Sequence, residues 1–263
     1  MADGAERRGD GTAGRIDVDR NIYAVAGRVA WANIGPCAAA TVLLVATDLG
    51  AGYLYAPLAF AVLRALILII VGYAAYRMLL SGGAISGFRA IATPDGRVPW
   101  RYAGVMLIIL GPVLVLGVVW TAPGTGMGPS GLAEVVLGLV MVITYAALYI
   151  LFGTALPEVA ERGEVSLRDA FERGRANYRR IGRAMVFGPW LFRVASILVL
   201  IGLNVAGLQT DPYSLDARAF QPAGLPPLFA FKASHIFAEL MTAVIMMRFY
   251  RRYRALPQDA LAA

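Results

Sequence analysis

The sequence is nearly devoid of the residues that most often bind metals, form disulfides or transfer protons. Histidine, cysteine and lysine occur once each in 263 residues, as His235, Cys37 and Lys232. One histidine cannot supply a bis-histidine haem or a histidine-rich metal site, and one cysteine permits neither an intrachain disulfide nor a four-cysteine cluster. The sequence also lacks a P-loop and a dinucleotide-binding glycine motif. We therefore expect no cofactor, no metal and no enzymatic activity.

Charged residues are scarce as well, and the apolar residues lie in long blocks. Charged residues make up 16% of the chain and apolar residues 59%, whereas a soluble domain is about a quarter charged. A helix needs about 20 apolar residues to cross the hydrocarbon of a bilayer. Six segments reach that length, at 29–48, 57–80, 101–121, 131–156, 184–208 and 227–250. The sequence thus predicts an all-α, polytopic membrane protein with six transmembrane helices.

The arginines predict the orientation of these segments. Twenty of the 23 arginines lie in residues 1–28, 77–101, 162–183 and 248–254, whereas the three connections on the opposite side hold only Arg218. By the positive-inside rule, both termini face the cytoplasm. This distribution accounts for the net charge of +7 without nucleic-acid binding. The excess of arginine over lysine and the abundance of alanine indicate a bacterial source, and hence the cytoplasmic (inner) membrane.

The chain is predicted to hold one folded domain between two short tails. Residues 1–15 are rich in glycine and charge, and we expect a disordered cytoplasmic tail there rather than a signal peptide. Residues 16–254 form the transmembrane domain, and residues 255–263 form a short cytoplasmic tail. Ahead of the first span, a short surface helix is predicted from apolar residues at helical spacing, namely Ile22, Val25, Ala26 and Val29.

A second amphipathic helix is predicted over residues 166–182, between the fourth and fifth spans. Ser166 and Asp169 have the spacing of an N-terminal capping pair. One face is apolar and carries Leu167, Ala170, Phe171, Gly174, Tyr178 and Ile181. The remainder carries six arginines, Arg168, Arg173, Arg175, Arg179, Arg180 and Arg183. We expect these arginines to bind anionic lipid headgroups or a partner protein at the cytoplasmic surface. An ordinary basic loop that only sets topology is the alternative.

A weak internal repeat is also suggested. The dipeptide Gly-Pro occurs at 35–36, 111–112 and 188–189, always in an odd-numbered predicted span, at spacings of 76 and 77 residues. Proline kinks a helix because it removes a backbone hydrogen bond. The spacing suggests three copies of one unit, in which an interfacial amphipathic helix precedes a helical hairpin.

Four short motifs resemble a known family. They are Ala155-Leu-Pro-Glu158, Ser166-Leu-Arg-Asp-Ala-Phe-Glu-Arg173, Asn177-Tyr-Arg-Arg-Ile181 and Met247-Arg-Phe-Tyr-Arg251. In layout and motifs the chain is similar to a broad family of six-helix bacterial membrane proteins. That family includes the YciC-like inner-membrane proteins and the membrane domain fused before some glycerophosphodiester phosphodiesterases. The resemblance implies a fold and a location, supplies no catalytic residue, and does not extend to a phosphodiesterase domain.

A few ionisable residues lie within the predicted spans, where charge is costly and usually faces the interior of the bundle. They are Arg64, Glu134, Arg193, Lys232, His235 and Glu239. The last three are spaced at i, i+3 and i+7 and therefore share one helical face. We expect Glu239 to pair with Arg193 or Arg64. We expect Glu134 to pair with Lys232 or Arg64.

Three readings of this polar cluster follow. It is either a structural network that holds the helices together or the lining of a path for an ion, a proton or an anionic solute. A more remote reading is a rhomboid-like intramembrane protease with a Ser130–His235 dyad, although Ser130 reads equally well as a helix N-cap. The sequence favours a non-enzymatic inner-membrane protein that organises the membrane or is an accessory to another membrane complex, alone or as a homo-oligomer. A small transporter or channel is the alternative.

Overall fold

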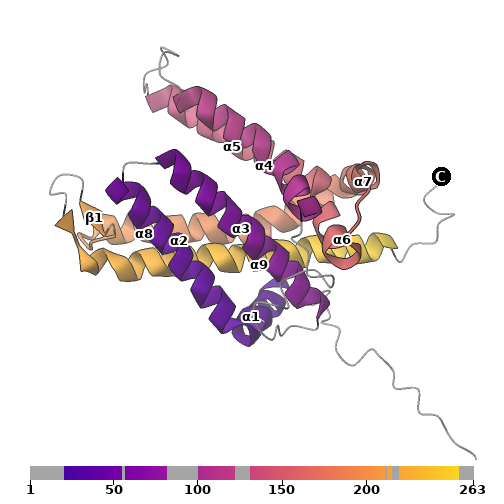
Figure 1. Ribbon diagram of the computed structural model, residues 1–263, viewed down its shortest axis with the longest axis horizontal. Coiled ribbons are helices and arrows are strands. Elements are labelled where there is room, and N and C mark those ends of the chain that lie inside the picture. Colours follow the sequence, from indigo (N-terminus) through magenta and orange to yellow (C-terminus); the bar gives the residue numbers. More distant parts are fainter. Residues whose placement is uncertain are drawn as a thin grey trace, which may run out of the picture.

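The computed structural model describes residues 21–54, 57–81, 100–121, 131–210, 212–214 and 219–254, and these residues are almost entirely helical (Figure 1). The first half contains α1 (Ile22–Ala32), α2 (Ile34–Leu54), α3 (Pro57–Leu80), α4 (Trp100–Thr121) and α5 (Gly131–Phe152). The second half contains α6 (Ala155–Arg162), α7 (Leu167–Met185), the π-helical turn η2 (Val186–Trp190), α8 (Leu191–Val205), the 3-10 turn η3 (Pro222–Gly224) and α9 (Leu225–Arg254). A two-residue antiparallel pair, β1 (Tyr213–Ser214) and β2 (Ala219–Phe220), precedes η3. The predicted tails, 1–15 and 255–263, lie outside the described residues.

Four of the described helical segments are long and apolar enough to cross a membrane: Ile34–Ala51, Ala59–Leu80, Leu167–Val205 and Pro222–Arg254. The number rises to five if α5 and α6, which are bent by 48° at the break between them, count as one span. Helix α4 contributes a shorter apolar stretch, Trp100–Leu116. The prediction of an all-helical chain with several apolar helices is confirmed. The helices are those expected of a multi-pass membrane protein, whereas six spans and cytoplasmic termini remain predictions.

Helix α9 is the element around which the others pack. In Figure 1 it runs along the long axis of the molecule, and α1, α2, α3, α7 and α8 all contact it. Every residue from 240 to 247 is buried, as expected for a helix that is apolar around its whole circumference. The Thr242 hydroxyl is satisfied locally, because it donates to the Ala238 carbonyl (2.9 Å). In the same view α4 and α5 form a hairpin that diverges from the other helices away from α6.

Short breaks shift two of the predicted span boundaries. The segment 29–48 begins inside α1, which ends at Ala32 and is separated from α2 by Asn33. The Asn33 amide donates to the Val29 carbonyl (2.8 Å) and so satisfies one of the last carbonyls of α1. The short surface helix predicted ahead of the first span is present, and its Val25, Ala26 and Val29 are buried.

The predicted span 131–156 is likewise wrong at its end, because the chain bends after Phe152. Gly153 lies at the bend, where a methyl group in place of its hydrogen would come within 3.0 Å of the Met246 sulfur of α9. A residue without a side chain therefore allows the bend to pack against the central helix. Helix α6 ends at Gly163, which has the left-handed backbone conformation typical of a glycine C-cap (φ 71°).

Helices α7 and α8 follow one another without a loop and are separated by a kink in η2, so the predicted surface helix at 166–182 and the predicted span at 184–208 are distinct helices whose boundary lies a few residues later than predicted. The predicted cap is confirmed, since the Ser166 hydroxyl oxygen accepts a hydrogen bond from the Asp169 amide (3.2 Å). The only departure from helical dihedral angles within η2 is at Gly188 (φ −105°, ψ −106°), directly before Pro189. Proline cannot donate the backbone hydrogen bond that would continue a regular helix there.

The suggested repeat agrees with the pairing of consecutive helices into hairpins, but the three prolines lie at different positions within their helices. Helices α2 and α3, α4 and α5, and α8 and α9 pack in consecutive pairs. Pro36 lies in the first turn of α2, Pro112 inside α4 and Pro189 in η2. Equivalent proline kinks are therefore absent from the described helices, and the threefold repeat remains a prediction.

Helix α7 crosses α5 at very close range, and Gly174 marks the crossing. A methyl group at Gly174 would lie 2.6 Å from the Leu151 Cα and 2.7 Å from the Ile150 carbonyl oxygen. Both neighbours are backbone atoms, which cannot move aside as a flexible side chain can. The contact between the backbones of α5 and α7 therefore requires glycine at this position.

We expect Gly174→Ala to destabilise the protein, because overpacking against backbone costs about 1–3 kcal/mol or more. Gly182→Ala is the matched control on the same helix, since a methyl group there makes only an ordinary 3.6 Å contact with the Ile150 Cδ1. Alanine is favoured over glycine inside a helix by about 1 kcal/mol, so the control should be as stable as the parent or more stable. Thermal unfolding in detergent measures both. Equal melting temperatures for the two variants would contradict this account of the crossing.

Candidate functional site

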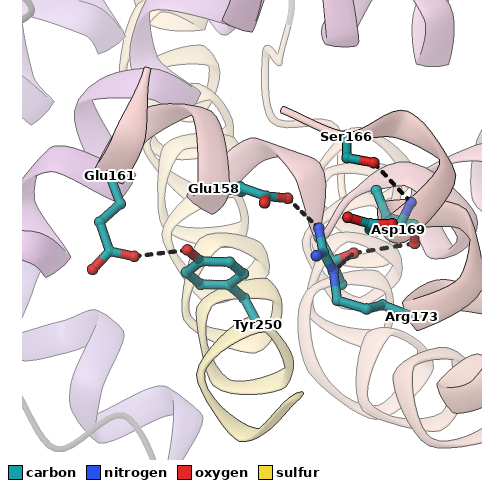
Figure 2. Close-up of polar contacts among 8 residues, drawn as sticks. Glu158, Glu161, Ser166, Asp169, Arg173 and Tyr250 are labelled. Carbon is teal, nitrogen blue, oxygen red and sulfur yellow. Dashed lines mark hydrogen bonds and ion pairs between the residues drawn. The ribbon is translucent and has the colours of Figure 1, made fainter. Parts of the chain in front are cut away.

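Two groups of polar side chains stand out, and the first lies where α6, α7 and the last turns of α9 meet, which we call the α6 end. Glu158 of α6 and Arg173 of α7 form a buried ion pair there (Figure 2), with exposed fractions of 8% and 5%. The Arg173 guanidinium also donates to the Thr154 hydroxyl (3.4 Å). It lies over two rings of α9, 5.8 Å from the centroid of Tyr250 and 5.6 Å from that of Tyr253. Arg173 thus joins α6, α7 and α9.

Glu161 makes the second link between α6 and α9. The Tyr250 hydroxyl donates to the Glu161 carboxylate (2.8 Å), and the Arg254 guanidinium donates to the same oxygen (3.0 Å). Figure 2 shows Glu161 turned toward Tyr250 of α9 and Glu158 turned toward Arg173 of α7. The Glu158 carboxylate therefore fixes α6 to α7, and the Glu161 carboxylate fixes it to the central helix α9.

The C-terminal end of α6 is held by two further arginines. Arg77 of α3 donates to the Ala160 carbonyl (3.3 Å), and Arg101 of α4 donates to the Gly163 carbonyl (2.8 Å). The last carbonyls of a helix lack intrahelical partners and carry the negative end of its dipole, so cationic donors suit them. Helix α6 is thereby tied to α3, α4, α7 and α9.

Helix α7 presents most of its charge to the outside. Five of its six arginines are exposed, and we call Arg168, Arg175, Arg179, Arg180 and Arg183 the arginine face. The prediction that Arg173 shares this face is wrong, because Arg173 is buried in its pair with Glu158. The predicted apolar face is also divided: Ala170, Gly174 and Ile181 are buried, whereas Leu167, Phe171 and Tyr178 are 38%, 37% and 47% exposed.

The second group consists of charges within the apolar helices. Arg193 of α8 and Glu239 of α9 form an ion pair, with side-chain exposed fractions of 25% and 13%. This is one of the pairings that the sequence predicts for Glu239. Tyr145 of α5 lies close enough to interact with both partners. Within the described residues, the Nε of Arg193 has no hydrogen-bond partner.

Asp48 of α2 is the partner that the sequence reasoning missed. It forms an ion pair with Lys232 of α9, whose side chain is 2% exposed, and a longer contact with Arg64 of α3 (3.6 Å). Asp48 is the last residue of the predicted first span, because an acidic residue after an apolar segment usually indicates the end of a span. Helix α2 in fact continues to Leu54. The available signal was Lys232 itself, because a lysine in an apolar helix requires an acidic partner at similar depth.

The remaining predicted residues are not brought into a reactive arrangement by the described part of the chain. The His235 Nδ1 lies 3.0 Å from the Phe231 carbonyl of its own helix, and its ring packs edge-on against the Phe231 ring. Glu134 lies in the first turn of α5, with its side chain outside the described set, and Ser130 lies outside the described residues altogether. Among the residues described, no group of three or more histidine, cysteine, aspartate or glutamate side chains could hold a metal.

Comparison with known proteins finds no matching family model, no matching curated protein and no matching solved structure. The resemblance to the YciC-like membrane proteins therefore stays a prediction from the motifs.

Removing one partner of the α6-end pair should be costly. Arg173→Gln leaves the Glu158 carboxylate buried without its counter-charge, and we expect a loss of about 3–5 kcal/mol in unfolding free energy. The matched control is Arg168→Gln on the same helix, where the pair with Glu172 (3.1 Å) is 88% and 54% exposed. An exposed pair of this kind contributes about 0.5 kcal/mol or less. Chemical unfolding in detergent compares the two. Similar losses in both variants would show that Arg173 does not hold α7 in place.

Proposed function

We propose that this chain is a non-enzymatic integral protein of a bacterial inner membrane, and that it organises the membrane by binding anionic lipid headgroups through the arginine face of α7. It crosses the bilayer six times, with α2, α3, α4, α5, α8 and α9, and both termini are cytoplasmic. The six predicted spans each overlap one of these helices, and the α6 end carries the basic residues that the positive-inside rule assigns to the cytoplasm.

The observation that carries the proposal is the contrast between the two kinds of arginine on one helix. Arg173 is buried and fixes α7 to α6 and α9, while the five arginines of the arginine face remain exposed. A basic helix held rigidly at the level of the headgroups attracts anionic lipid with about 1 kcal/mol for each arginine near the surface. Of the five, Arg168 alone forms an ion pair with another described residue, Glu172. The other four are available for headgroups.

The intramembrane charges support a structural role for the polar cluster. Arg193 is compensated by Glu239, whereas Lys232 and Arg64 share the single negative charge of Asp48. Each pair joins two helices of the bundle, which is the arrangement expected of a charge network that holds helices together. One observation favours the alternative of a small transporter or channel: Arg193 remains 25% exposed, and its Nε lacks a partner among the described atoms.

Anionic lipid should stabilise the protein in a way that depends on charge and salt. In nanodiscs at low salt, we expect a higher melting temperature in mixed anionic lipid than in zwitterionic lipid. The difference should shrink at high salt, because exposed charges are screened. Replacing the five arginines of the arginine face by glutamine should remove most of the difference, whereas replacing them by lysine should preserve it, since the charge is retained. An unchanged lipid dependence in the glutamine variant would refute the proposal.

Substitutions in the Arg193–Glu239 pair distinguish a structural role of the polar cluster from a role in transport. If the pair is structural, Arg193→Gln and Glu239→Gln each lower the melting temperature, and the double variant recovers most of the loss because no unpaired charge remains. Proton or ion flux into proteoliposomes should be at background level in all forms. Single variants that fold normally but change a measured flux would replace this proposal by the transporter or channel.

A further inference from the structure

An apolar groove lies between α5 and the C-terminal half of α7 together with η2. Its volume is about 660 Å³, and Ala146 and Ala147 of α5 face Gly182 and Val186 across it. The groove exists because small side chains line both helices at this point. A methyl group at Gly182 would reach only an ordinary contact with α5, at 3.6 Å. A larger side chain at position 182 would instead occupy the groove.

The apolar groove adjoins a basic hollow on α7. That hollow has a volume of about 530 Å³ and is lined chiefly by arginines of the arginine face, namely Arg175, Arg179, Arg180 and Arg183. Tyr178, Arg179 and Arg183 line both spaces. Neither space has an acidic residue in its described lining. Arg179 and Arg183 form no ion pair with any residue that the structure describes, so their positive charge is uncompensated within the described part of the chain.

An apolar groove that ends at uncompensated arginines is complementary to a molecule with an anionic head and an apolar chain. A soluble phosphate compound would fill only the basic hollow and leave the groove empty. An apolar helix of a partner would fill the groove but would make no use of the exposed arginines at its end. An amphiphile satisfies both parts at once. Its phosphate suits guanidinium groups in particular, because arginine donates two parallel hydrogen bonds to phosphate oxygens.

We propose that the groove binds one anionic glycerophospholipid, with its phosphate between Arg179 and Arg183 and one acyl chain over Ala146, Ala147 and Gly182. The inference rests on the proposed function, in which the α6 end lies at the level of the cytoplasmic headgroups. It deepens that proposal by assigning a single stoichiometric site. The groove residues of α5 extend from Ile150 to Ile143. Seven residues of helix span about 10 Å, so the acyl chain of the bound lipid would run from the headgroup level into the hydrocarbon.

The test is native mass spectrometry of the full chain in detergent, titrated separately with phosphatidylglycerol and phosphatidylcholine of the same acyl chains. The wild type should bind one phosphatidylglycerol with at least about tenfold preference, as expected for charge-assisted hydrogen bonds to a phosphate in a fixed site. Gly182→Leu should weaken that binding by about tenfold or more, because the side chain occupies the groove. Gly182→Ala is the matched control and should bind as the wild type does.

A double variant on α7 separates the paired hydrogen bonds of arginine from its charge and does not depend on the folding of Gly182→Leu. The double variant Arg179→Lys, Arg183→Lys keeps the charge but loses the paired hydrogen bonds of arginine, and it should lose the tight site. Its melting temperature should still rise in anionic nanodiscs, because the arginine face as a whole is electrostatic. Tight binding that survives in this variant and in Gly182→Leu would overturn the groove site while leaving the proposed function in place.

Two further outcomes would also overturn the site. If glycerol 3-phosphate displaces phosphatidylglycerol at equal concentration, the acyl chain contributes nothing and the groove is not a lipid site. If a second copy of the chain occupies the groove, dimers will exclude the lipid. A protein that shows neither tight binding nor any anionic-lipid effect on its melting temperature would refute the groove site and the proposed function together.

Discussion

Burial of charge away from water is the constraint on which the arrangement of this bundle depends. An ion moved from water into a protein interior costs several kcal/mol even after relaxation, so each buried charge needs a partner on a neighbouring helix. Helix α9 takes part in most of these contacts. Lys232 binds Asp48 of α2, Glu239 binds Arg193 of α8, and Tyr250 binds Glu161 of α6. These two ion pairs and this hydrogen bond thus specify that α2, α8 and α6 pack against α9. Apolar side chains alone would not distinguish one apolar helix from another.

The α6 end extends the same principle into the connection between α5 and α8. A short helix of eight residues such as α6 is marginal by itself, because the first turn costs more than it gains. Here its carboxylates and terminal carbonyls are bound by side chains of four other helices. The ends of α3, α4, α7 and α9 are therefore held in register by one small element, and α7 is left with one buried and one exposed set of arginines.

Much of the architecture can be predicted from the sequence because apolar blocks and caps are local signals. The apolar segments are helices, the Ser166 cap is present, and the apolar positions before the first span form a buried helix face. The breaks at Asn33 and Gly153 were missed because apolar residues continue across them. Asp48 was missed, and Arg173 was placed on the exposed face, for a different reason. Whether a charged residue near a helix end faces outward or inward depends on its partner across the bundle, which no local pattern contains.

The π-helical turn joins the exposed part of α7 to the interior without an intervening loop. Helices α7 and α8 follow one another across the kink in η2, and Arg193 follows Trp190, the last residue of η2, by less than one turn. The non-helical dihedral angles at Gly188 are the one described departure from helical geometry on this path. Because α7 and α8 meet at Gly188 without a connecting loop, the backbone angles of this one residue set the angle between the two helices, and with it the position of the arginine face relative to the Arg193–Glu239 pair.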